Sequence, residues 1–365
     1  MNVVLRSPGI YCQMPGAISY LGKYVKMFGK RALLVSTLGS FERYGNRLVV
    51  EDDSLTINSA IVERETTQLE IDNVIEQFAE NKSELIIGFG GGKTLDTARA
   101  AADAVNCPLI IVPTVASNDA PCSALAVIHD ENGAVTELRT TKRNPDIVLV
   151  DTDILIDAPE RLFVAGLGDA LATYFEATAC SKSGALTLAG AGSSDISLTL
   201  SKLCFDTLIN YGSAAIHAVR AGMANDAFDK VIQATIYLSG IGFESGGVAA
   251  AHAINDGFSA CPESSHLYHG EIVGFGTLSM LMLENADSET VNTVLDFMCN
   301  VGLPVSFEQL GIDPTDDLLM RVADAACTKS VMSNMPFEVT PADVIRAMLK
   351  ADLIGKSKLA ENEGR

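Results

Sequence analysis

The first 150 residues alternate between short apolar runs and longer segments whose apolar residues recur at helical spacing. Continuous apolar runs of this kind are typical of strands that are buried on both faces of a parallel sheet. Four such runs occur, at 32–36, 85–88, 109–112 and 147–150. Helical segments are expected near 18–29, 68–80 and 93–105. This alternation predicts a doubly wound parallel sheet, whose ligands bind at the carboxyl ends of the strands.

Two stretches depart from this alternation, one inside the first 150 residues and one after them. Residues 123–139 form a strand, a turn at Asp130–Gly133 and a second strand, which predicts a hairpin. Beyond residue 150 the strand signal fades, and a helix is expected to begin at Pro159–Leu162. Long Ala-, Leu- and Gly-rich helical stretches follow, at 166–180, 195–210, 227–257, 270–286 and 316–327.

Length and charge agree with this organisation and narrow the possible partners. In 365 residues we expect an α/β domain at 1–155 and an all-helical domain at 156–365, with a small-molecule site in the cleft between them. The 26 basic and 46 acidic residues give a net charge of −20, which disfavours nucleic acid and anionic membranes as partners. The uncharged apolar stretch 272–283 is too short to span a bilayer.

The cysteines and the first residues of the chain both favour a reducing compartment inside the cell. The eight cysteines are scattered and include no Cys-x-x-Cys pair, which favours reduced thiols over a disulfide framework or a cysteine-bound zinc site. The first residues lack the basic start and apolar core of a secretory signal. We therefore expect a cytoplasmic protein.

A glycine-rich turn joins an apolar run to a helical segment. The run from Leu85 is followed by Gly90, Gly91 and Gly92, and the helix opens with Lys93-Thr94. This arrangement presents backbone N–H groups and the positive end of a helix dipole to a phosphate. A lysine in the first turn opposes the dipole by about 0.3–1 kcal/mol unless an anion lies there. The spacing fits neither the P-loop nor the Rossmann pattern, and a tight connection without a ligand is the alternative.

Three separate helical segments carry side chains that suit a metal ion. Asp169 lies in an apolar helix, His252 in a segment of small residues, and His269 at a junction of loop and helix. A buried, unpaired carboxylate costs several kcal/mol, so Asp169 needs a cation or good donors. Two imidazoles and one carboxylate would leave zinc or ferrous iron one open position, at which the pKa of a bound alcohol falls. His266 competes for a ligand position, and each histidine alone also suits an ordinary core or surface role.

A polar segment follows the apolar run 109–112. Asp119 can accept hydrogen bonds from substrate hydroxyls, and Thr114 and Ser117 can reach cofactor oxygens. The alternative is that these side chains only cap turns and helices.

Together these segments resemble the glycerol dehydrogenases, a family within the iron-containing alcohol dehydrogenase-like superfamily. The resemblance runs nearly end to end and includes 7–9, 88–98, 113–125, 168–173, 242–247, 250–253 and 268–271. It implies a dehydroquinate synthase-like architecture, with an α/β dinucleotide-binding domain followed by an all-α metal- and substrate-binding domain. It also implies NAD-dependent oxidation of glycerol, or of related short vicinal diols, to dihydroxyacetone with a bound Zn²⁺, Fe²⁺ being the alternative.

The resemblance assigns roles to individual residues. Asp169, His252 and His269 would hold the metal and, with Asp119, form the catalytic set. Asp119, Phe243 and His252 would contact the substrate. The cofactor would bind at Gly90, Gly91, Gly92, Lys93, Thr94, Asp96, Thr114, Ser117, Ser123, Leu125, His129 and Thr37. The family tends to form rings of eight, so a homo-oligomer is implied.

Some positions depart from the family pattern. Thr37 stands where an acidic residue usually binds the adenosine ribose, and Arg43 lies near it in the sequence, which leaves NADP open as a cofactor. His129 stands where tyrosine is common and Asn118 where threonine is common.

Two other functions remain as alternatives. The first is a superfamily member that acts on another polyol or on a phosphorylated substrate, such as glycerol-1-phosphate dehydrogenase or the lyase dehydroquinate synthase. A phosphorylated substrate requires a basic cluster, yet the basic residues between 166 and 274 are only Lys182, Lys202, Arg220 and Lys230, none of them next to a candidate ligand in the sequence. The second is a nucleotide-binding or sensor protein without catalytic activity.

Overall fold

The computed structural model describes residues 3–48, 52–63, 65–131, 133–328 and 330–363. It divides into two compact units. The first unit comprises Arg6–Pro159 with Gly222–Ala224, and the second comprises Glu160–Ala221 and Asn225–Arg365 with Met1–Leu5.

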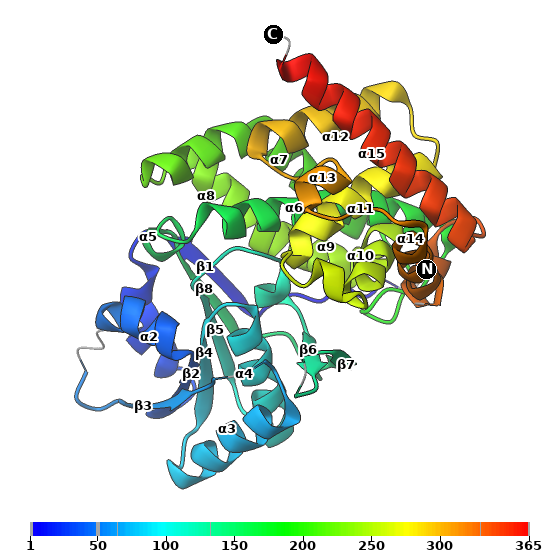
Figure 1. The fold of residues 1–365 in the computed structure, drawn as a ribbon. Helices are drawn as coiled ribbons and strands as arrows, with labels where there is room; N and C mark the ends of the chain where they lie inside the picture. Colours follow the sequence, from blue (N-terminus) through cyan, green and yellow to red (C-terminus); the bar gives the residue numbers. More distant parts are fainter. Residues whose placement is uncertain (1–2, 49–51, 64, 132, 329, 364–365) are drawn as a thin grey trace. The chain divides into compact units, whose positions relative to one another are not determined.

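A six-stranded sheet forms the centre of the first unit (Figure 1). Its strands lie in the order β1-β8-β5-β4-β2-β3, and all neighbouring pairs in this sheet are parallel. The strands are β1 (Ile10–Met14), β2 (Arg31–Ser36), β3 (Thr56–Ile61), β4 (Leu85–Gly90), β5 (Leu109–Pro113) and β8 (Ile147–Asp151). The four apolar runs of the sequence are the four inner strands, so the predicted α/β fold class is confirmed.

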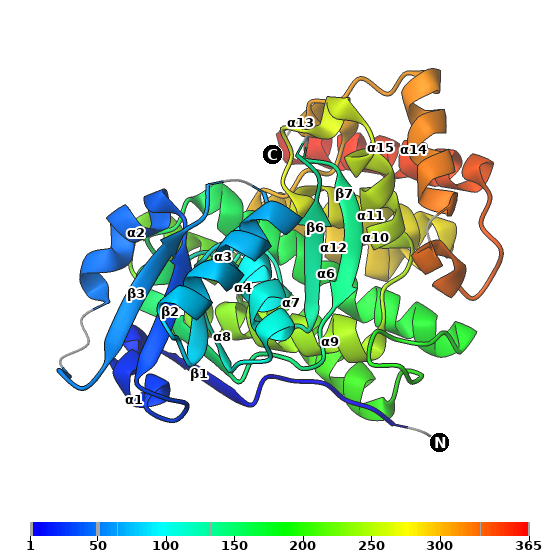
Figure 2. The ribbon, with the colours of Figure 1, turned by 90° about the horizontal axis from the view of Figure 1, so that it is seen from below.

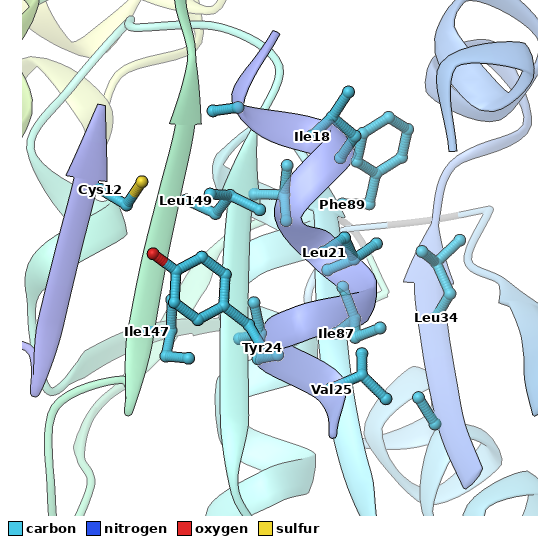
Figure 3. Close-up of a cluster of buried hydrophobic side chains, with 14 of the residues drawn as sticks. Cys12, Ile18, Leu21, Tyr24, Val25, Leu34, Ile87, Phe89, Ile147 and Leu149 are labelled. Carbon is cyan, nitrogen blue, oxygen red and sulfur yellow. The ribbon is translucent and has the colours of Figure 1, made fainter. Parts of the chain in front are cut away.

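Helices cover both faces of this sheet. Ile87 and Phe89 point from β4 into a core that is closed by the 3-10 helix η1 (Ala17–Tyr20) and by α1 (Leu21–Val25) (Figure 3). Gly88, between them, faces the opposite way, since a Cβ there would lie 2.9 Å from the Cβ of Ala98 on α4 (Gly92–Val105). α3 (Gln68–Glu80) packs beside α4. The sheet is therefore doubly wound, as alternating elements require.

The remaining elements of the first unit are short. They are α2 (Leu38–Tyr44), the 3-10 helices η2 (Gly45–Arg47) and η3 (Ala120–Cys122), β6 (Leu125–His129), β7 (Val135–Thr140) and α5 (Thr152–Leu155). β6 and β7 pair antiparallel and run side by side (Figure 2), which confirms the predicted hairpin. Asn132 of its turn lies outside the described residues. The helix expected over 18–29 is shorter in the structure, where η1 and α1 follow one another and helical geometry ends at Val25.

The second unit is helical, apart from an isolated bridge between Leu186 and Gly192. Its longer helices are α6 (Glu160–Ser183), α7 (Asp195–Ala221), α8 (Asp226–Gln233), α9 (Ser239–Gly246), α10 (Ala250–Ser259), α11 (His269–Leu283), α12 (Ser288–Val301), α14 (Asp316–Thr328) and α15 (Pro341–Glu363). Short turns complete it, namely the π-helix η4 (Ala234–Leu238), η5 (Pro262–Ser264), α13 (Phe307–Leu310) and η6 (Ser330–Asn334). Among the described residues, no helix is both long and apolar enough to cross a membrane.

The helix expected over 227–257 is wrong as a single element. η4 interrupts its first half, and the chain leaves helical geometry between α9 and α10. Gly247 has a φ of +101°, a left-handed value that favours glycine and ends α9. A Cβ at Gly247 would also lie 2.6 Å from the sulfur of Cys180. His252 is consequently the third residue of a new helix rather than a residue in the middle of a long one.

Candidate metal site and glycine turn

The second unit brings Asp169, His252 and His269 together. One ligand atom from each lies within 4.8 Å of the other two. The Oδ1 atom of Asp169 lies 3.2 Å from Nε2 of His269 and 3.5 Å from Nε2 of His252. The Asp169 side chain is 1% exposed, that of His252 19% and that of His269 42%. The cluster therefore has a buried anionic base and a side that opens towards solvent.

Glycines set the distance between the helices that carry these side chains. A Cβ on Gly168 would lie 2.1 Å from the carbonyl oxygen of Gly270, and a Cβ on Gly270 would lie 1.8 Å from that of Ala165. α6 and α11 thus touch backbone to backbone at the residues that adjoin Asp169 and His269. α10 approaches α11 in the same way, because a Cβ on Gly276 would lie 2.6 Å from the carbonyl oxygen of Ala251, next to His252.

Glu176 contacts His252 at Nδ1, the ring nitrogen that does not face Asp169. It lies seven residues after Asp169 on α6 and is completely buried. Its Oε2 is 2.6 Å from Nδ1 of His252, and its Oε1 accepts the backbone N–H groups of Ala249 at 2.8 Å and His252 at 2.9 Å. Sequence reasoning missed this residue; its one signal is a second acid two helical turns after the first in an apolar helix.

A different pair of residues, Arg161 and Glu271, fixes the helical turn that carries His269. Arg161 of α6 donates to both carboxylate oxygens of Glu271, at 2.6 and 2.8 Å. Glu271 also accepts the N–H of Tyr268 at 2.8 Å, so it caps the first turn of α11, where His269 begins the helix. His266, the competing histidine, lies outside the cluster, and its Nε2 is 2.9 Å from the carbonyl oxygen of Leu310.

The charges of the cluster call for a cation. Burial alone would raise the pKa of Asp169, but the imidazoles of His269 and His252 outweigh burial and hold that pKa well below its usual range. Burial would lower the pKa of His252, but Glu176 and Asp169 raise it well above the ordinary value. Two buried carboxylates thus demand positive charge between them. The donor set of two imidazole nitrogens and one carboxylate oxygen fits Zn²⁺ or Fe²⁺ with one position left open.

The glycine turn lies at the carboxyl edge of the sheet in the first unit. Gly90 pairs in register with Pro113, and Phe89 with Ser36, so the residues after β2, β4 and β5 meet at one edge. The chain runs outward from β2 to β3 and returns to β4 on the other side of β2, which makes the edge between β2 and β4 a topological switch point. Gly91 is the N-cap residue of α4 and provides no side-chain cap, so it leaves the first N–H groups of this helix available to a phosphate.

Neighbouring predicted residues frame this turn. Thr37 caps α2, its hydroxyl accepting the N–H of Ser40 at 3.3 Å, and Thr114 donates its N–H to Gly90 at 3.0 Å. A Cβ at Gly90 would lie 2.7 Å from Oγ1 of Thr94, so only glycine fits there without a shift of that side chain. Arg43 donates to the carbonyl oxygen of Asp157 and lies over the Tyr44 ring.

Two of the predicted cofactor residues have protein partners for their charges. Lys93 forms an ion pair with Glu65, so a bound anion is not required to offset its charge at the helix terminus. Asp96 is buried, pairs with Arg99 and accepts the N–H of Val127 at 3.1 Å. Burial raises the pKa of Asp96 although Arg99 opposes that shift. Their cofactor roles stay predictions.

Arg99 is a second residue that the sequence analysis missed. It is buried and donates to the carbonyl oxygens of Ala120 and Leu125, so it ties α4 to the polar segment and to the hairpin. The polar segment contains the predicted residues Ser117 and Asp119, and the predicted residue Ser123 follows it directly. Asp119 and Ser123 are buried, and the Ser123 hydroxyl donates to Ala120 at 3.2 Å.

Two further predicted residues lie on β6 and on α9. The backbone N–H of His129 on β6 donates to Thr66, and its Nδ1 is buried without a hydrogen-bond partner among the residues that the structure describes. Phe243 is a buried residue of α9, a helix that packs on α6 and α7 of the second unit. Their cofactor and substrate roles stay predictions.

Comparison with known proteins identifies the family. Residues 8–152 match the family described as iron-containing alcohol dehydrogenase. The chain is 44% identical to a glycerol dehydrogenase of Escherichia coli O6:H1, over 100% of both chains. It is 42% identical to a glycerol dehydrogenase of Citrobacter freundii, over 99% of this chain and 100% of that protein. The solved structure of a probable glycerol dehydrogenase from Sinorhizobium meliloti 1021 has a TM-score of 0.92 and 37% identity, covering 98% of this chain and 100% of that one. The chain therefore belongs to the family of iron-containing alcohol dehydrogenases, and within it to the group of the glycerol dehydrogenases.

Proposed function

We propose that this chain catalyses the NAD-dependent oxidation of glycerol, and of related short vicinal diols, at a secondary carbon. Glycerol then gives dihydroxyacetone: its carbon loses a hydride to the nicotinamide ring and its hydroxyl loses a proton to solvent. The observation that carries this proposal is the convergence of Asp169, His252 and His269 within 4.8 Å. The names of the two curated relatives and of the solved structure support glycerol as the substrate.

The metal-binding residues fit a divalent ion, for which we propose zinc, with ferrous iron as the alternative. When bound, such an ion supplies a Lewis acid that lowers the pKa of a hydroxyl in its open position. Asp169 contributes the negative charge and is fixed by burial. Glu176 orients His252, and the pair of Arg161 and Glu271 fixes the helical turn that carries His269.

The cofactor site is proposed at the carboxyl edge of the sheet. The uncapped N–H groups at the start of α4 would hold the pyrophosphate, and Thr114, Ser117, Ser123, Leu125 and His129 would line the remaining cofactor contacts. We propose NAD as the cofactor, with NADP as the alternative, because Thr37 offers a hydroxyl in place of a ribose-binding carboxylate. Asp119 would bind the substrate hydroxyls and Phe243 would cover the substrate. Hydride transfer requires the reacting carbon and the ring to come within about 3–3.5 Å.

We also propose that the protein is a cytoplasmic homo-oligomer, an octamer. Exposed apolar side chains in the second unit, at Leu186, Ile196 and Leu203, support self-association. The eight cysteines are all free thiols, which supports a reducing compartment. Light scattering of the purified protein tests the assembly, since a mass of one 38.6 kDa chain would contradict it.

A spectrophotometric screen tests the proposed reaction. The purified protein is assayed for NADH and NADPH formation with glycerol, short vicinal diols and glycerol phosphate, before and after chelation and after addition of Zn²⁺ or Fe²⁺. We expect NADH formation with glycerol that is lost on chelation and restored by a divalent ion. Turnover only with glycerol phosphate would assign the phosphorylated-substrate alternative, and full activity in metal-free protein would refute the proposed role of the cluster.

A further inference from the structure

Glu176 makes three hydrogen bonds that all end on one short segment. Its Oε1 accepts the N–H groups of Ala249 and His252, and its Oε2 lies 2.6 Å from the imidazole Nδ1 of His252. The side chain is completely buried, so no water replaces any of these partners if one is lost. Both the backbone at the start of α10 and the ring of His252 are therefore fixed by one carboxylate.

This contact decides which ring nitrogen carries the hydrogen. An ionised carboxylate only accepts hydrogen bonds, so Nδ1 of His252 must be the donor. A histidine binds a metal as the neutral ring, and in that form the lone pair is then on Nε2, the nitrogen that faces Asp169 at 3.5 Å and belongs to the cluster with His269. A carboxylate bound to the far nitrogen of a ligating histidine orients the ring and increases its basicity.

We propose that Glu176 is a positioning residue that sets the tautomer and orientation of His252, and thereby the affinity of the cluster for a divalent ion. This inference rests on the proposed function, since it assumes that the cluster binds a metal. Glu176 is not a ligand itself: within the described residues, the group of side chains that could share an ion consists of Asp169, His252 and His269.

Replacing Glu176 by glutamine keeps the shape of the side chain and changes only which of its atoms donate and accept hydrogen bonds. Glu176→Gln is nearly isosteric, and its amide oxygen can keep the two backbone N–H groups. Its NH₂ group then faces Nδ1–H of His252, donor against donor. The ring must place its hydrogen on Nε2, which blocks the metal, or the amide must turn and leave the two backbone N–H groups unpaired. Glu176→Asp keeps an acceptor but has one methylene less, so we expect it to lie between wild type and Glu176→Gln.

Metal affinity is the first measurement. Metal-free protein is titrated with Zn²⁺ against a chromophoric chelator, with thermal unfolding as a check on folding. We expect Glu176→Gln to bind Zn²⁺ about 10- to 100-fold more weakly than wild type, and Glu176→Asp to lose less. Glu160→Gln is the matched control, because Glu160 is a partly exposed acid on the same helix that pairs with Arg220, and the variant should bind Zn²⁺ as wild type does.

The imidazole proton provides a second readout that a merely structural role would not move. In zinc-loaded protein labelled with ¹⁵N-histidine, His252 of the wild type should give a low-field Nδ1–H proton that exchanges slowly. The same signal should persist in Glu176→Asp and should move upfield or exchange away in Glu176→Gln. His252→Gln identifies the signal by removing it.

The outcomes separate this inference from the proposed function. If wild type takes up no divalent ion, the metal-dependent function fails and this inference fails with it. If wild type binds Zn²⁺ and Glu176→Gln binds it within twofold with an unchanged Nδ1–H signal, only the role of Glu176 is wrong. Should Glu176→Gln not fold, wild-type Zn²⁺ affinity in a Glu176→Asp protein that has lost the Nδ1–H signal would overturn the inference.

Discussion

The backbone contact between α6 and α11 allows a sharp test of how the cluster is assembled. We consider Gly270→Ala, which adds one methyl group beside His269. Its Cβ would lie 1.8 Å from the carbonyl oxygen of Ala165 and 3.1 Å from the backbone nitrogen of Asp169. An ordinary contact of this kind begins at 3.4 Å, and both neighbours are backbone atoms that cannot rotate away. The two helices must therefore separate by more than about 1 Å at the position of the ligands.

Two opposing contributions to the stability of Gly270→Ala can be estimated. Alanine is the better helix former by about 0.8–1.0 kcal/mol, so propensity alone would stabilise the variant. Overpacking of a close contact costs about 1–3 kcal/mol or more, so we expect net destabilisation. Metal–ligand distances tolerate only about 0.2 Å of error, and a misplacement of about 1 Å can cost about 100-fold in rate. Zinc affinity and glycerol turnover should thus fall far more than the stability.

Urea unfolding, zinc titration and NADH formation measure these effects in Gly270→Ala. The control is Gly192→Ala in the same unit, where a Cβ would meet nothing within 4 Å and the φ value is not left-handed. We expect the control to match wild type in all three measurements. Wild-type zinc affinity and turnover in folded Gly270→Ala would refute the claim that the glycine contact positions the ligands.

Three further predictions concern other parts of the chain. His252→Ala should release the metal and abolish turnover while NAD still binds in calorimetry; retained activity in metal-free protein would contradict the proposed ligand set. Arg99→Met leaves the buried carboxylate of Asp96 without its cation, so the free energy of unfolding in urea should fall by about 3–5 kcal/mol, and a loss below 1 kcal/mol would argue against a tight buried pair. Burial raises the pKa of Glu284 above the ordinary 4.5, so its ionised form destabilises the fold, and this penalty grows as the pH rises from 4.5 through the folded pKa. Glu284→Gln should therefore stabilise the protein against urea at neutral pH but not below pH 4.5; equal effects at both values would refute this explanation.

The inner strands could be predicted because burial on both faces leaves an unbroken apolar run. The edge strands β1 and β3 could not, since they are partly exposed and carry polar residues such as those of Thr56–Ile61. Their pairing depends on neighbours that are distant in the sequence, such as Ile10 with Ile147. The helices α12 and α15 were likewise not assigned from the sequence.

The sequence predicts the three ligands of the metal site, but it does not predict the residues that orient them. Asp169 is visible because a carboxylate in an apolar helix needs a partner. Glu176 gives the same signal, but its partner is 76 residues away, and only the fold joins them. Glu65, the partner of Lys93, is 28 residues away, so this ion pair too is formed only by the fold.

The spacing of Asp169 and Glu176 on α6 makes this helix intolerant of changes in length. Seven residues correspond to about two turns, which places both carboxylates on one face of the helix. An inserted or deleted residue between them would rotate Glu176 by about 100° around the helix axis and shift it by about 1.5 Å. Natural relatives that share this arrangement should therefore vary in length within the loop 184–194 and keep the register of α6 unchanged.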